Sequence, residues 1–245
     1  MIDLHCHILP GADDGVATVG ESCHMARLAA ADGITAIVAT PHVCNGLYWN
    51  ARDAIEKKVY ELNNALKRIA TPLKVIPGAE VQLTAKLVER LQRGEASTIN
   101  NSRYVLLALP QIFGLDGAKN EISALRMHGY IPILASAERH AKFRHDFECL
   151  RDIVELGVFC QITAASLTGG FGRDIRSVAE KMVLDGMAHV LATDSHAPSW
   201  REPVLSAAMK RAARLLGSEA KARRMVSDTP RAIIADRDIA TNIRL

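Results

Sequence analysis

The sequence lacks the features that define membrane-inserted, exported or nucleic-acid-binding proteins. No apolar run approaches the ~18 residues that a membrane-spanning helix requires. The chain opens directly into a predicted strand, without the charged and apolar leader of a signal peptide. Its net charge is only +3, and no basic run or aromatic-interleaved patch accompanies that charge. We therefore expect no membrane span and no nucleic-acid partner.

Disulfide frameworks and flexible linkers are also missing. The 5 cysteines are scattered, odd in number and free of CxxC spacing, which argues against a disulfide-stabilised fold and is typical of the reducing cytoplasm. No stretch rich in proline, glycine or serine divides the 245 residues. The composition, 49% hydrophobic and 23% charged, is that of an ordinary soluble protein. We therefore expect one domain over residues 1–245.

Short apolar runs alternate with longer segments in which apolar residues recur every three or four positions. The short runs predict strands at 2–5, 34–40, 73–81, 104–109, 131–136, 158–163 and 189–193. The longer segments predict helices at 20–32, 50–69, 85–91, 118–127, 146–156 and 174–184, and a helical tail follows from about residue 203. Strands that are each followed by a helix imply a parallel sheet with right-handed crossovers. The predicted fold is an α/β barrel, with an open doubly wound sheet as the alternative.

The most informative motif is His5-Cys6-His7, at the end of the first predicted strand. Because side chains alternate along a strand, His5 and His7 point to the same side and Cys6 points away. Two imidazoles at the carboxyl end of a strand are a usual beginning of a divalent-metal site, although two histidines also fall two apart by chance. The pair alone leaves both interpretations open.

Further polar residues follow the ends of other predicted strands, where barrel proteins place their chemistry. They are His42, Glu80, Glu138, Arg139, Asp194 and His196, and Asp13 and Asp14 lie in the first loop. Carboxylates together with imidazoles suit Mn, Zn, Fe or Mg, and no cysteine occupies a ligand position. These residues converge only if the barrel is right, so the predicted fold and the predicted metal site support each other.

Six segments together resemble one protein family. They are MIDLHCHILPGADDG at 1–15, ATPH at 39–42, PGAE at 77–80, AER at 137–139, QITAASLTGGFG at 161–172 and ATDSH at 192–196. In sequence and order they resemble the polymerase-and-histidinol-phosphatase (PHP) superfamily, and more narrowly the bacterial manganese-dependent protein-tyrosine phosphatases of capsule and exopolysaccharide operons. The resemblance implies a distorted (β/α)7 barrel of PHP type with up to three metal ions. It also implies hydrolysis of phosphotyrosine on a membrane-associated tyrosine kinase.

The same resemblance assigns roles to individual residues. It implies a first metal bound by His5, His7, Glu80 and Asp194, and a third metal bound by Asp14, His42 and His196. It implies that Arg139 and Arg201 hold the substrate phosphate, for which the guanidinium fork is suited. Asp13 or His196 would assist protonation of the leaving group, although a phenol needs little such help.

Two positions depart from the family pattern. The resemblance implies a glutamate and a histidine as ligands of the second metal, which Glu80 would bridge to the first, and this chain has Ala108 and Ser136 at those places. Both losses fall on the same ion, so we expect two metals rather than three, with manganese first among the candidates. His140 or His145 could replace a lost ligand.

The sequence leaves three functions open. The leading hypothesis is a metal-dependent protein-tyrosine phosphatase. The losses at Ala108 and Ser136, with both arginines retained, also allow a catalytically weakened regulatory module that binds phosphotyrosine. The third is a phosphoesterase acting on a small molecule. Tyr48 and Trp49 would either stack on an aromatic substrate or anchor their own loop. The sequence does not decide between a monomer and a homo-oligomer.

Overall fold

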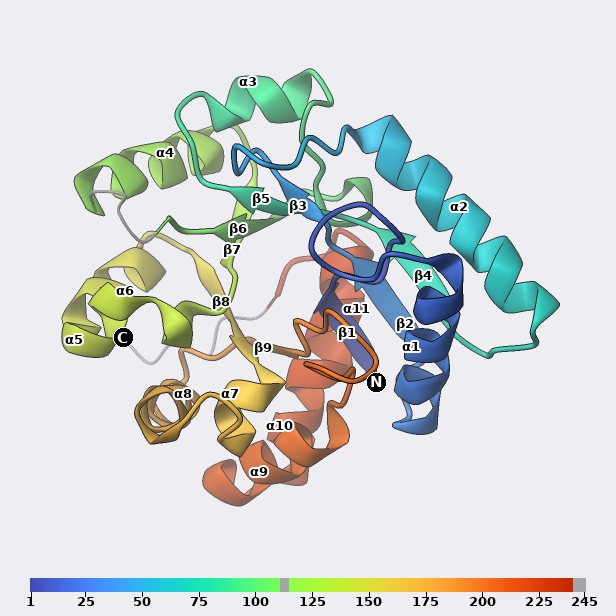
Figure 1. The fold of residues 1–245 in the computed structure, drawn as a ribbon. Coiled ribbons are helices and arrows are strands. Elements are labelled where there is room, and N and C mark those ends of the chain that lie inside the picture. Colours follow the sequence, from blue (N-terminus) through green and yellow to red (C-terminus); the bar gives the residue numbers. More distant parts are fainter. Residues whose placement is uncertain (111–114, 240–245) are drawn as a thin grey trace.

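The chain folds into a parallel sheet that is curled into a barrel and wrapped by helices (Figure 1). The structure is a computed structural model that describes residues 1–110 and 115–239. The strands are β1 (Ile2–Cys6), β2 (Ala36–Ala39), β3 (His42–Val43), β4 (Lys74–Pro77), β5 (Glu80–Gln82), β6 (Tyr104–Ala108), β7 (Ile131–Leu134), β8 (Phe159–Thr163) and β9 (Val190–Ala192). The pairings between these strands are parallel, in the orders β1-β2-β4 and β3-β5-β6-β7-β8-β9.

Two strands of the barrel are interrupted. Thr40-Pro41 separates β2 from β3, which lies beyond the predicted strand 34–40. Gly78-Ala79 separates β4 from β5, where the sequence predicts one strand over 73–81. Glycine is required at the second break, because a Cβ atom on Gly78 would lie 2.6 Å from Cγ1 of Val38. Beyond the two breaks, β3 pairs with β5 and His42 stands opposite Glu80. The interruptions therefore bring two candidate metal ligands side by side.

The two edges of the curled sheet meet at the residues after β9. The N–H of His7 donates to the carbonyl of Ser195 at 2.8 Å, and the N–H of Asp194 donates to the carbonyl of His5 at 2.8 Å. When each interrupted strand is counted once, the described residues form a barrel of seven strands. The predicted (β/α)7 barrel is confirmed, and the alternative of an open doubly wound sheet is wrong.

Apolar residues fill the barrel and join it to the helices. One buried cluster takes a residue from each strand of the barrel: Leu4, Val38, Ile76, Leu106, Ile133, Phe159 and Val190. Neighbouring residues of the same strands, such as Ile37 and Val105, belong to a second cluster that includes Leu62 and Ile153 of the surrounding helices. Both faces of the strands are thus buried, as a parallel barrel inside a layer of helices requires.

Helices cover the outside of the barrel (Figure 1). They are α1 (Val19–Ala31), α2 (Arg52–Arg68), α3 (Leu87–Gln92), α4 (Leu115–Met127), α5 (Ala141–His145), α6 (Phe147–Glu155), α7 (Ala164–Thr168), α8 (Arg173–Leu184), α9 (Ser206–Leu216), α10 (Glu219–Val226) and α11 (Asp228–Ile234), with the 3-10 helices η1 (Ile99–Asn101) and η2 (Ala137–Arg139). The predicted C-terminal helical tail corresponds to α9, α10 and α11, whereas the short α5, α7, η1 and η2 are absent from the sequence prediction. None of the helices described is long and apolar enough to cross a membrane.

His189, just before β9, gives the stability of the fold a pH dependence. Its Nδ1 accepts a hydrogen bond from the N–H of Cys160 at 3.0 Å, and burial lowers its pKa from 6.5 to about 4. Below pH 6.5 the unfolded chain therefore takes up a proton that the folded chain does not take up until about pH 4. The free energy of unfolding falls as the pH falls through this window, by up to about 3 kcal/mol.

We predict that His189→Asn removes this part of the pH dependence, because an asparagine oxygen keeps the acceptor for Cys160 but does not titrate. Urea denaturation of both proteins between about pH 4 and pH 7 measures the free energy of unfolding at each pH. The wild-type chain should lose more stability on acidification than the variant. An equal loss in the two proteins would contradict the assignment to His189.

Candidate metal and phosphate site

The residues predicted for the site converge at the carboxyl ends of the strands. They come from β1 and the loop after it (His5, His7, Asp13, Asp14), from β3 (His42), from β5 (Glu80), from η2 (Arg139) and from the segment after β9 (Asp194, His196, Arg201). Each of these side chains contacts at least one of the others, at the distances given below. The structure therefore brings the whole predicted set together.

His5 and His7 face each other with their Nε2 atoms 3.2 Å apart. Nδ1 of His5 donates to Oε1 of Gln161 at 2.9 Å, and Nδ1 of His7 donates to Oδ2 of Asp13 at 2.6 Å. With their hydrogens on Nδ1, the neutral rings turn two Nε2 lone pairs toward the same point. Two opposed lone pairs repel each other unless a cation lies between them. The donor geometry therefore fits a bound metal ion.

Carboxylates surround the same point and favour positive charge there. Oε2 of Glu80 and Oδ1 of Asp194 lie 3.4 and 3.3 Å from Nε2 of His5. Burial alone would lower the pKa of His7, but its hydrogen bonds to Asp13 and Asp194 and the nearby charges raise that pKa to about 10. A site that holds a proton on a buried imidazole has an excess of negative charge. The same negative charge would stabilise a divalent cation at this point.

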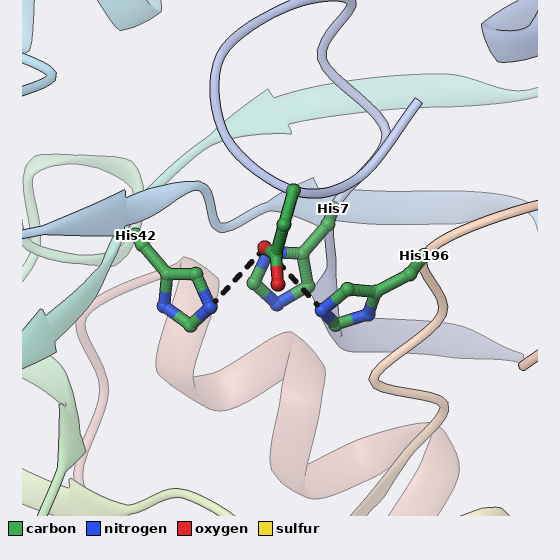
Figure 2. Close-up of side chains that lie close together, drawn as sticks. His7, His42 and His196 are labelled. Carbon is green, nitrogen blue, oxygen red and sulfur yellow. Dashed lines mark ion pairs between the residues drawn. The ribbon is translucent and has the colours of Figure 1, made fainter. Parts of the chain in front are cut away.

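A second cluster of ligand atoms lies beside the first. It consists of His7, Asp14, His42 and His196, whose donor atoms lie within 4.8 Å of one another. Figure 2 shows the imidazoles of His7, His42 and His196 turned toward a common centre. Oδ1 of Asp14 lies 3.5 Å from Nε2 of His42 and 3.7 Å from Nε2 of His196. Nδ1 of His42 is 2.9 Å from Oε2 of Glu80, which joins the two clusters.

Two guanidinium groups meet at one oxygen of Asp194. Nη2 of Arg139 donates to Oδ2 of Asp194 at 2.7 Å and to Oγ of Ser136 at 3.1 Å. Nη2 of Arg201 donates to the same Oδ2, and its Nη1 lies 3.3 Å from Nε2 of His196. Oδ1 of Asp194 faces the imidazoles instead. The carboxylate therefore stands between the candidate cations and an arginine pair suited to a phosphate group.

The backbone near the arginines adopts an uncommon conformation. Ser136, Asp194 and Arg201 have φ angles of 48°, 51° and 55°. Residues other than glycine rarely enter this left-handed region, and such strain concentrates at functional sites where the surroundings enforce it. After Ser136 the chain turns into η2, where buried Glu138 accepts a hydrogen bond from the N–H of Thr163 at 3.0 Å. This bond fastens η2, which carries a candidate phosphate ligand, to β8.

Asp13 does not have the protonation state of an acid catalyst. Its Oδ2 accepts from the imidazole of His7 and from the N–H of His42 at 2.9 Å. Its Oδ1 accepts from the N–H of Gly15 at 3.0 Å. Burial would raise the pKa of Asp13, but these hydrogen bonds hold it below its usual value. At neutral pH the carboxylate has no proton to donate to a leaving group, and the geometry suits it to orienting His7.

The ring of His196 is oriented by a backbone carbonyl oxygen. Burial, together with the charge of His7, lowers the pKa of His196 to about 4. Its Nδ1 lies 3.0 Å from the carbonyl oxygen of Asp194, so the neutral ring carries its hydrogen there and leaves Nε2, which faces Nη1 of Arg201, without a hydrogen. A free Nε2 is the state that metal coordination needs. The geometry therefore supports the expected role of His196 as a ligand.

Ala108 and Ser136 line one cavity beside Glu80. The cavity has a volume of about 290 Å³, and His140 also forms part of its wall. Within residues 1–110 and 115–239, the groups of ligand atoms close enough to share a metal are the two clusters above, and neither includes His140 or His145. Among the residues that line this cavity, Glu80 and His140 carry side chains that commonly coordinate metal ions, whereas Ala108 carries none.

Sequence reasoning missed the residues that orient this site. Oε1 of Gln161 on β8 accepts from His5 and also from the N–H of Ser136 at 3.0 Å. Asp3 on β1 accepts from the N–H of Thr193 at 2.9 Å, which ties β1 to the segment after β9. The signal that could have found them is a polar side chain inside a strand buried on both faces, since such groups need partners.

A barrel whose strand ends gather histidines, carboxylates and a pair of arginines is typical of a metal-dependent hydrolase. The family model for capsular polysaccharide synthesis proteins of the CpsB/CapC type matches residues 1–235. The chain belongs to this family, and the predicted family is confirmed.

Named relatives and a solved structure agree with this assignment. Tyrosine-protein phosphatase YwqE of Bacillus subtilis is 36% identical over 196 residues, which are 80% of this chain and 77% of that protein. The putative tyrosine-protein phosphatase CapC of Staphylococcus aureus is 34% identical over 204 residues, with coverage of 80% and 77%. A crystal structure from work on YwqE and on CpsB of Streptococcus pneumoniae, described as unique metal-dependent tyrosine phosphatases, matches with a TM-score of 0.94 at 32% identity. It covers 99% of this chain and 98% of that one.

We predict that Asp13→Asn weakens manganese binding about 10- to 100-fold, because the charged acceptor that holds His7 in its ligand tautomer is lost. Calorimetric titration of metal-free protein with manganese measures the affinity. Asp53→Asn, on the exposed side of α2, is the matched control and should bind like the wild type. Full affinity in folded Asp13→Asn protein would show that Asp13 does not orient His7.

Proposed function

We propose that this chain hydrolyses phosphotyrosine in a protein substrate, as a metal-dependent phosphomonoesterase of capsular or exopolysaccharide synthesis. The observation that carries the proposal is the meeting of Arg139 and Arg201 at Asp194, directly beside two clusters of metal-ligand atoms. The relatives named as tyrosine-protein phosphatases support the choice of substrate.

In this proposal the chain's own residues bind and orient the phosphate. Arg139 and Arg201 donate hydrogen bonds to the phosphoryl oxygens and give up part of their contact with Asp194. Divalent cations, when bound, polarise those oxygens and acidify a water molecule. Asp13 keeps His7 in the tautomer whose Nε2 is free. The phenol of tyrosine has a pKa of about 10, so its departure needs no strong acid from the protein.

We propose two metal ions, with manganese first among the candidates. One set of ligands is His5, His7, Glu80 and Asp194, and the other is Asp14, His42 and His196. His7 serves one ion only, because Asp13 engages its Nδ1 and leaves Nε2 as its free nitrogen. Nitrogen and oxygen donors without thiolate suit manganese, and iron, zinc and magnesium share this preference in part. The cavity at Ala108 and Ser136 supports two ions rather than three.

The partner that we propose is a membrane-associated tyrosine kinase of polysaccharide synthesis, which this single-domain chain meets in the cytoplasm. The family's link to capsular polysaccharide synthesis supports this choice. A regulatory module that binds phosphotyrosine without hydrolysis is the second candidate. It is favoured by the cavity at Ala108 and Ser136, where the family pattern places metal ligands.

Hydrolysis of a phosphotyrosyl peptide with and without manganese is the direct test. We predict turnover with manganese, loss of turnover after chelation and recovery when the metal is restored. Arg201→Ala should lower kcat/KM about 100-fold with unchanged metal content, since it removes a donor to the phosphate. If folded protein shows no turnover with any divalent metal, but still binds the peptide after chelation, the binding module replaces the phosphatase.

Restoring the absent ligands tests the number of metals. We predict that Ala108→Glu combined with Ser136→His raises the metal content from about two to about three equivalents per chain, because a carboxylate and an imidazole then join Glu80 around the cavity. Elemental analysis of metal-loaded protein measures the content. The control, Ala108→Gln with Ser136→Asn, adds similar bulk with weaker ligands and should remain at two. Three equivalents in the wild-type chain would contradict the two-ion proposal.

A further inference from the structure

Two aromatic side chains lie against the arginine pair. Cζ of Arg139 is 5.1 Å from the ring centroid of Phe171, and Cζ of Arg201 is 5.8 Å from the same centroid. Cζ of Arg201 is also 5.4 Å from a ring centroid of Trp200. These distances are within the range of cation–π interactions. Trp200 meets His196 edge to face, with ring centroids 6.0 Å apart, so it contacts both a candidate phosphate ligand and a candidate metal ligand.

A short turn fixes Trp200 in this position. The N–H of Ala197 donates to the carbonyl of Trp200 at 3.1 Å, and the N–H of His196 donates to the carbonyl of Arg201 at 3.3 Å. Pro198, inside the turn, restricts the backbone between them. The indole is therefore tied to the backbone that carries both the imidazole and the guanidinium beside it.

The exposure of the side chains shows from which side a substrate reaches the arginines. The side chains of His5 and Asp194 are 0% and 2% exposed, so the site is closed beneath them. The side chain of Asp14 is 55% exposed and Trp200 is 62% exposed. His196 contacts both of these exposed residues. Asp14 and Trp200 therefore lie on an exposed side of the site, next to His196.

We propose that Trp200 receives the aromatic ring of the phosphate ester, while Phe171 holds the two guanidiniums that bind its phosphate. The inference rests on the proposed function and adds the residue that selects aryl over alkyl esters. The ring of Phe171 lies close to both guanidiniums, whereas Trp200 keeps much of its surface free beside Arg201. Stacking a second ring on the exposed indole removes apolar surface of both rings from water.

Trp49 provides an internal comparison. It is 66% exposed, and its ring contact among the described residues is with Arg90, whose Cζ lies 5.6 Å from the centroid. Tyr48, beside it, stacks on His42 with centroids 6.2 Å apart. Trp49 thus matches Trp200 in residue type and exposure, but its contact is with a residue outside the metal and phosphate site. It supplies the control for the experiments below.

Tryptophan fluorescence tests the ring contact without hydrolysis. The chain has 2 tryptophans, so Trp49→Phe leaves Trp200 as the only reporter. In manganese-loaded Trp49→Phe protein, we expect phenylphosphonate, which has no ester to hydrolyse, to change the emission, and methylphosphonate to change it much less. Trp200→Phe protein should show no change with phenylphosphonate. Equal changes with the two phosphonates, or phenylphosphonate binding no tighter than methylphosphonate, would overturn the proposal.

Kinetics separates ring recognition from phosphate binding. Trp200→Leu keeps apolar bulk without a ring, and we expect it to raise KM for phenyl phosphate roughly 3- to 10-fold. In Trp200→Leu protein, KM for an alkyl phosphate and inhibition by inorganic phosphate should not change. Trp200→Phe protein should have most of the wild-type affinity for phenyl phosphate. The control, Trp49→Leu, should behave as wild type. An equal rise for both esters would mean that Trp200 only supports Arg201. A fluorescence response without any hydrolysis by the wild type would instead refute the proposed function and leave the ring contact standing.

Discussion

The pairing of β1 with the residues after β9 is the interaction on which both the barrel and the site depend. Hydrogen bonds from His7 to Ser195 and from Asp194 to His5 close the sheet. Because three of these four residues are candidate ligands, the same backbone contact sets the distance between imidazole and carboxylate. Buried Asp3 accepts a further hydrogen bond across this seam. A barrel left open at this edge would lose its cation site along with its closure.

Asp194 links the two parts of the site, the candidate metal ligands and the arginine pair. One of its oxygens faces imidazoles and the other faces guanidiniums, so a single carboxylate stabilises positive groups of two kinds. Burial lowers the pKa of Arg201, Asp194 raises it, and the neighbouring charge of Arg139 lowers it again. Asp194 and the ring of Phe171 offset the repulsion between the two guanidiniums. A phosphate brings the additional negative charge that this crowded pair lacks, so the arrangement is prepared for an anion before it arrives.

Most of the barrel and the position of the metal site follow from the sequence, because alternation along strands, helical spacing and polar residues at strand ends are local properties. The break at Gly78 is not local, since it depends on Val38 packing against a position that has no Cβ. The meeting of Phe171 and Trp200 at Arg201 likewise joins two loops whose relative position only the closed barrel determines. Sequence patterns locate the chemistry, and tertiary contacts decide which side chains orient it.

In the two-ion proposal, the electrostatic balance of the site shifts toward the arginines. Oγ of Ser136 lies 2.8 Å from Oγ1 of Thr163 and accepts from Arg139 at 3.1 Å, so the position keeps a role in holding the guanidinium. Two ions in place of the three that the resemblance implies would mean two positive charges fewer, and alanine in place of the implied glutamate at position 108 one negative charge fewer. On this proposal the centre would face a phosphate with one positive charge less than a three-metal site. Arg139 and Arg201 must then contribute a larger share of the attraction for the anion than they would beside three metal ions.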